Sequence, residues 1–227
     1  MELWHGSEVI VEKPLLDKCR RFNDYGRGFY CTPYEEMAME WACRTEKGGI
    51  ANRYELAMEG LSILNLESAE YSILNWLAVL ASNREFNVST PLARQGLSYL
   101  LDNWLVDLKP YDVVCGYRAD DSYFSFARQF VNGALSLQQL QQAMHLGNLG
   151  VQYALISERA FAVVRFVEWK HVPGSEYYAK RFKRERAARE RYLDIANGFD
   201  AEGIYIQDLI AGRVEHDDPR VGGLWTE

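Results

Sequence analysis

The amino-terminal segment constrains the fold of this chain more than any other part of the sequence. Residues 3–7 (Leu-Trp-His-Gly-Ser) read as a short strand, and the glycine-flanked loop 24–28 leads into an aromatic strand at residues 28–32. A helix follows from Pro33 to about residue 45, because proline suits a first helical turn and apolar side chains recur on one face. A strand, a glycine-flanked loop and an aromatic strand in this order predict a slot for a flat ring.

The rest of the sequence alternates between strand and helix patterns. The predicted strands cover residues 1–5, 8–12, 51–58, 61–66, 111–117 and 151–157, and residues 159–167 continue the sheet after a turn. The predicted helices cover residues 71–82, 91–105, 123–132, 136–144 and 175–197. Ser136 and Gln139 have capping-box spacing, and residues 201–212 read as a strand or a short helix.

Composition limits the classes of protein to which the chain can belong. Its 227 residues are 48% hydrophobic, which is enough for one sizeable core. The net charge of -7 argues against a general nucleic-acid binder. We expect a cytoplasmic protein with free thiols and no metal site, because its four cysteines form no metal-ligand pattern and no signal peptide or bilayer-length apolar run is visible. Export without a cleaved signal stays open.

Four segments together resemble an uncharacterised bacterial domain family of the ADP-ribosyltransferase superfamily. They are residues 3–7, 24–32, 111–123 and 152–161, and the resemblance is closest to the branch whose catalytic set is His, Tyr and Glu. It implies an α+β fold, with a split, mostly antiparallel sheet that cradles NAD and with helices inserted at 71–105 and 122–146. It also implies an NAD-binding domain over residues 1–172 and a helical carboxy-terminal extension over residues 173–227.

The resemblance further implies which residues bind NAD, the substrate. They are His5, Gly6, Ser7, Gly28, Tyr30 and Trp41. His5 would bond the adenosine-side ribose, while Gly6 and Ser7 would hold the nicotinamide amide. Tyr30 and Trp41 would sandwich the nicotinamide ring, since a flat, electron-poor ring stacks on aromatic side chains. Core packing is an equally open interpretation of Trp41.

The implied catalytic set is His5, Tyr30 and Gln152, in which Gln152 stands where the family branch has glutamate. A glutamine can bond a ribose hydroxyl, but it carries no negative charge to stabilise a cationic ribose. The chain would therefore transfer ADP-ribose with help from another carboxylate, hydrolyse NAD slowly, or bind a nucleotide without chemistry. Glu158 and the pair Asp120–Asp121 are the candidate carboxylates, although Asp120–Asp121 equally fits a helix N-cap.

By resemblance, the function is that of a mono-ADP-ribosyltransferase that acts as a bacterial toxin or effector. Its acceptor, protein or nucleic acid, is unknown, a neutralising antitoxin-like partner is implied, and no membrane is involved. The alternatives are a catalytically silent NAD or ADP-ribose sensor and a protein-interaction module. We interpret Asp24 and Gly26 as turn residues, and the basic stretch 180–191 as a solvated helix face.

Overall fold

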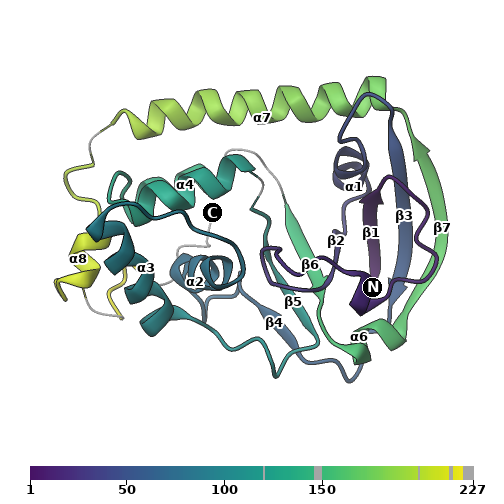
Figure 1. Cartoon of the computed structure of the whole chain (residues 1–227), viewed down its shortest axis with the longest axis horizontal. Helices are drawn as coiled ribbons and strands as arrows, with labels where there is room; N and C mark the ends of the chain where they lie inside the picture. Colours follow the sequence, from purple (N-terminus) through teal and green to yellow (C-terminus); the bar gives the residue numbers. More distant parts are fainter. Residues whose placement is uncertain (120, 146–149, 199, 215–216, 222–227) are drawn as a thin grey trace. The chain divides into compact units, whose positions relative to one another are not determined.

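The computed structural model describes residues 1–119, 121–145, 150–198, 200–214 and 217–221 (Figure 1). The chain divides into two compact units. The first contains residues 1–65, 107–118 and 149–185, and the second contains residues 66–106, 119–148 and 186–227. None of the described helices has the length and hydropathy that crossing a membrane would require. The domain boundary expected at residue 172 stays a prediction.

Two β-sheets form the centre of the first unit. The three-stranded sheet has the order β1 (Glu2–Ser7), β3 (Gly49–Leu56), β7 (Val164–Val172), and both of its pairings are antiparallel. The four-stranded sheet has the order β2 (Phe29–Cys31), β6 (Val151–Leu155), β5 (Val113–Tyr117), β4 (Ile63–Asn65). Only β4 and β5 pair in parallel within these sheets. The predicted α+β class is therefore confirmed, and the sheets are mostly antiparallel.

Successive residues of β1 enter two different apolar clusters, because side chains alternate across a strand. Leu3 packs with Phe29 and Leu155 in the cluster that joins the two sheets. Trp4 packs with residues of α1 (Glu35–Ala42) in a second cluster on the opposite face. The first unit also holds η1 (Leu16–Lys18), α6 (Glu158–Val163) and the first half of α7 (Gly174–Ala196).

The second unit is helical. It contains α2 (Ile73–Asn83), α3 (Pro91–Trp104), α4 (Asp121–Val131), α5 (Leu137–His145), α8 (Ile206–Ile210) and the second half of α7. The amino-terminal end of α5 is capped as the sequence indicates. The Ser136 hydroxyl accepts a hydrogen bond from the Gln139 N–H at 3.1 Å, and the Gln139 Oε1 accepts one from the Ser136 N–H at 2.9 Å. The predicted capping box is confirmed.

Two predicted strands differ from the structure. Residues 8–12 form no strand, because side chains of β3 bond their backbone: Asn52 Oδ1 accepts from the Val11 N–H at 2.9 Å, and Tyr54 Oη donates to the Val11 carbonyl at 2.5 Å. The prediction for residues 159–167 is wrong up to Val163. Ser157 Oγ accepts from the Ala160 N–H at 3.2 Å and caps α6, after which β7 pairs with β3 in the other sheet.

Candidate functional site

The candidate site begins where the pairing between β1 and β2 stops. Trp4 and Thr32 exchange two backbone hydrogen bonds, of 2.7 and 2.9 Å, in an isolated bridge. An antiparallel ladder would next pair Gly6 with Tyr30. Instead, His5 Nδ1 lies 2.7 Å from the Tyr30 carbonyl oxygen. Along a strand, the backbone N–H and C=O groups of every second residue point to the same side. Those of Gly6 therefore point the same way as those of Trp4, toward the edge at which the ladder has ended.

The proton positions on His5 follow from this contact. Burial lowers the pKa of His5; the hydrogen bond to Tyr30 raises it, and the charge of Arg44 lowers it further. In the neutral ring, Nδ1 carries the hydrogen because a carbonyl oxygen only accepts, and Nε2 keeps a lone pair. The ring packs on Phe29, with centroids 4.4 Å apart. His5 can therefore accept a hydrogen bond from a hydroxyl, as a ribose ligand must.

Gly6 lies directly beneath α1. A Cβ at this position would be 2.0 Å from the Ala38 carbonyl oxygen and 2.6 Å from the Ala42 nitrogen. The helix backbone therefore approaches β1 as closely as it does because residue 6 has no side chain. The contact fixes the Gly6 backbone, whose amide and carbonyl groups are the predicted ligands of a carboxamide.

The Ser7 hydroxyl takes part in a loop-holding network. It donates to the Val9 carbonyl at 2.6 Å and accepts from Asn52 Nδ2 at 3.0 Å. Asn52 is fully buried on β3, and its side chain also bonds the backbone of Val11. The role of Ser7 toward nicotinamide stays a prediction, since its proton is given to Val9 here. Sequence reasoning missed Asn52, although asparagine is unfavourable inside a strand and so marks the position.

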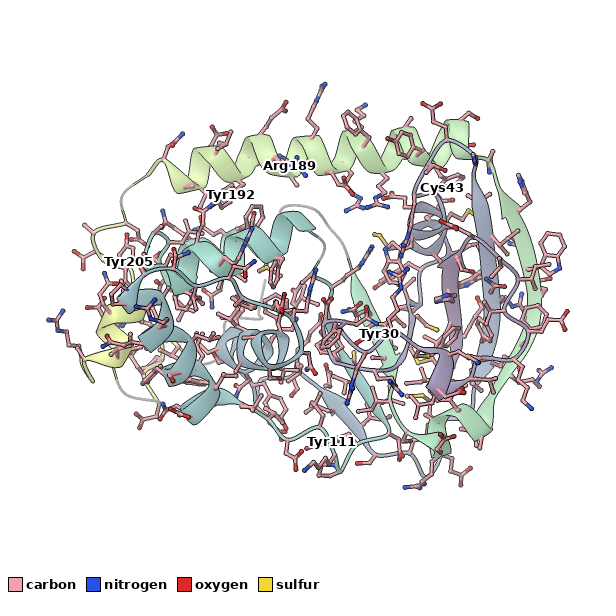
Figure 2. All side chains as sticks on the ribbon, viewed as in Figure 1. Tyr30, Cys43, Tyr111, Arg189, Tyr192 and Tyr205 are labelled. Atoms are coloured by element: carbon pink, nitrogen blue, oxygen red, sulfur yellow. The ribbon has the colours of Figure 1, made fainter. Side chains whose placement is uncertain are left out.

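Tyr30 holds the glycine-flanked loop in place (Figure 2). Its hydroxyl accepts from the Tyr25 N–H and donates to the Gly26 carbonyl, both at 2.8 Å. The rings of Tyr30 and Tyr25 are nearly parallel, with centroids 6.3 Å apart and an interplanar angle of 13°. A Cβ on Gly28 would lie 2.8 Å from the Leu155 carbonyl oxygen, so glycine lets this loop approach β6. Gly28 thus has a packing role, and its contact with NAD stays a prediction.

Trp41 is half-buried on α1, and a cation covers its ring. The guanidinium carbon of Arg118 lies 4.4 Å from the ring centroid. The indole Nε1 is buried, and among the described residues it has no hydrogen-bond partner. The predicted sandwich of nicotinamide between Tyr30 and Trp41 is not tested by these contacts, and sequence reasoning did not foresee Arg118 at this ring.

Gln152 lies on β6 as predicted, but it is almost fully buried, with 2% of its surface exposed. Its Nε2 donates to Asp24 Oδ2 at 2.9 Å and to the Tyr117 carbonyl at 3.2 Å. Asp24 is itself buried, with 6% exposed. Tyr25 Oη donates to the same Tyr117 carbonyl at 2.6 Å. These bonds join the glycine-flanked loop to the end of β5 and to β6.

The other candidate carboxylates lie in different positions. Glu158 is exposed in the first turn of α6. Asp120 lies outside the described residues, as does the side chain of Asp121, whose backbone begins α4. Asp24, interpreted from the sequence as a turn residue, is the carboxylate that contacts Gln152. The two are 128 residues apart, so no local pattern could connect them.

The fold and the site define an α+β protein whose candidate site lies where its two β-sheets separate. The chain belongs to the family described as "Protein of unknown function (DUF3990)", which it matches over residues 1–166. No curated protein and no solved structure matches it. The matched range contains all the candidate site residues described above.

Proposed function

We propose that this chain is a mono-ADP-ribosyltransferase that cleaves the nicotinamide–ribose bond of NAD and passes ADP-ribose to an acceptor. The observation that carries the proposal is the bond from His5 to the Tyr30 carbonyl, which takes the place of a ladder bond at the edge toward which the Gly6 N–H and C=O point. A primary amide such as that of nicotinamide needs one acceptor and one donor at fixed positions, and an extended strand edge supplies both.

The proposed reaction breaks the bond between the ribose C1′ and the nicotinamide nitrogen. The bonding electrons pass to the pyridinium nitrogen and neutralise it, while positive charge develops on the ribose. The oxygen of a hydroxyl group or of water then bonds to C1′ and loses its proton to the solvent, while neutral nicotinamide leaves. His5 Nε2 would accept a hydrogen bond from a ribose hydroxyl, and the ring of Tyr30, stacked on buried Tyr25, would supply an aromatic wall for the departing ring.

A silent NAD-binding module is the second candidate function, and Gln152 is the observation that favours it. Its side chain is a neutral amide whose nitrogen is bonded to Asp24 and to the Tyr117 carbonyl. Such a group can bind a sugar hydroxyl through its oxygen but cannot carry charge by itself. The sensor and the enzyme would both be stabilised by NAD, and only the enzyme would release nicotinamide.

The test is nicotinamide release from NAD by the purified chain, beside His5→Ala. We expect release by the wild type and a loss of at least about 100-fold in His5→Ala, because the ribose contact and the opening of the sheet edge both depend on the ring. His171→Ala is the matched control, since His171 is an exposed histidine on β7. Stabilisation by NAD without release of nicotinamide would support the sensor. If NAD neither stabilises the protein nor is cleaved, NAD binding is refuted.

A further inference from the structure

We infer that Asp24 and Gln152 act together as the anionic group of the proposed site, with Asp24 as a positioning residue that acts through Gln152. The inference rests on the proposed function and names the source of the negative charge that glutamine lacks. Its structural basis is the 2.9 Å hydrogen bond between two buried side chains, from Gln152 Nε2 to Asp24 Oδ2.

The first step concerns the orientation of the Gln152 amide. Its nitrogen has two hydrogens, and its two neighbours there are a carboxylate oxygen and the Tyr117 carbonyl oxygen. Neither neighbour can donate, so the nitrogen has to face them and Oε1 has to point elsewhere. Gln152 therefore presents an acceptor oxygen in a fixed direction, as a glutamate oxygen would when it binds a ribose hydroxyl.

The second step concerns charge. A hydrogen bond to an ionised carboxylate is stronger than one between neutral groups, and it increases the negative character of the amide oxygen through polarisation. A glutamate at position 152 would instead place two buried carboxylates within hydrogen-bonding distance, and this arrangement is unfavourable. Glutamine at 152 and aspartate at 24 thus keep one negative charge in the slot and avoid two.

The third step concerns the position of that charge relative to the aromatic wall. Asp24 precedes Tyr25, whose N–H donates to Tyr30 Oη at 2.8 Å and whose own hydroxyl donates to the Tyr117 carbonyl at 2.6 Å. Gln152 bonds that same carbonyl. The charge of Asp24, the amide of Gln152 and the ring of Tyr30 are therefore held by one connected network of hydrogen bonds, 2.6 to 3.2 Å long.

The experiment measures kcat and KM for nicotinamide release in four proteins: wild type, Asp24→Asn, Gln152→Glu, and the double variant Asp24→Asn/Gln152→Glu. We expect Asp24→Asn to lower kcat by about 10-fold to 100-fold, with KM changed less than about threefold, because the charge acts on the cationic ribose more than on bound NAD. Gln152→Glu should lower kcat by a similar factor for a different reason: two buried carboxylates repel each other, and the hydrogen bond that orients residue 152 is lost. The double variant restores one carboxylate facing one amide, so its kcat should return to within about tenfold of wild type.

Asp17→Asn is the control for loss of a carboxylate, because Asp17 is exposed in η1 of the same unit. Melting temperatures accompany every variant, and the double variant carries the test if a single variant does not fold. A wild-type kcat in a folded Asp24→Asn protein would overturn this inference, and so would a folded double variant whose kcat is not restored. Both results would leave the proposed function standing. No release by the wild type would overturn the proposed function and this inference with it.

Discussion

The two sides of the candidate site are built on different physical principles. On the β1 side, close backbone packing sets the geometry, with α1 resting on Gly6 and His5 filling the place of a ladder hydrogen bond. On the β5–β6 side, a buried polar pair sets it, through Asp24 and Gln152. The first side should be sensitive to added volume and the second to added charge, so substitutions of each kind can separate the two.

The largest effect on stability is expected when side-chain volume is added on the β1 side. Gly6→Ala places a Cβ 2.0 Å from the Ala38 carbonyl oxygen, so α1 or β1 has to move. We expect the free energy of unfolding to fall by about 3 kcal/mol or more in urea denaturation. Gly198→Ala is the control, because its Cβ would lie 3.6 Å from the Ile195 carbonyl oxygen. A loss below about 0.5 kcal/mol in Gly6→Ala would refute the packing argument.

Charge on the β5–β6 side should have the next largest effect. Gln152→Glu puts a second carboxylate against buried Asp24 and should cost about 2 kcal/mol at pH 7. The neighbouring charge raises the pKa of the new carboxyl in the folded state, so the cost is present at neutral pH and disappears as the pH falls toward 4. Urea denaturation at both pH values tests this, with the exposed Gln142→Glu as control. A cost independent of pH would argue against charge repulsion.

Removal of one polar anchor on the β1 side should have a smaller effect. Asn52→Ala removes the bonds that hold Ser7 and Val11, at 3.0 and 2.9 Å, and should lower the free energy of unfolding by about 1 to 2 kcal/mol. Limited proteolysis should also cut residues 8–11 faster. The control is Asn103→Ala, whose side chain is exposed on α3. Unchanged cleavage of this loop would show that Tyr54 alone suffices to hold it.

The smallest effect concerns the ionisation of His5. Its pKa in the folded protein lies below the ordinary value of 6.5, mainly because of burial. As the pH falls, the His5 ring is therefore protonated in the unfolded chain before it is protonated in the folded protein. The contribution of neutral His5 to stability is complete above pH 6.5 and is lost as the pH falls toward the folded-state pKa. We expect His5→Asn to have a flatter stability profile than wild type between pH 7.5 and 5.5. Parallel profiles would contradict a lowered pKa.

Sequence reasoning reached much of the framework because local patterns were enough for it. The helical period placed α2, α3 and α5, and the order of strand, loop and strand brought His5, Gly6 and Tyr30 to one junction. It failed where tertiary contacts decide. Residues 9–11 read as strand because valine and isoleucine favour strands, yet Val9 and Ile10 are exposed there and side chains of β3 bond Val11.

The two polar contacts that define the site were beyond sequence reasoning for the same reason. Asp24 and Gln152 are 128 residues apart, and each has an ordinary local explanation, as a turn residue and as a polar strand residue. Asn52 is likewise one polar residue in an alternating strand until its burial beneath the loop is known. Burial and pairing across the chain gave these residues their significance.

The strand order has a consequence for how this chain is made. β2 is joined to β5 through β6, which ends at Leu155. β3 pairs with β1 on one edge and gains its second partner only from β7, which ends at Val172. During synthesis, His5, Gly6, Asp24 and Tyr30 emerge from the ribosome early, while Gln152 and the strands that complete both sheets emerge late. Long-range pairing of this kind folds slowly, so the nascent chain holds an incomplete site for most of its translation.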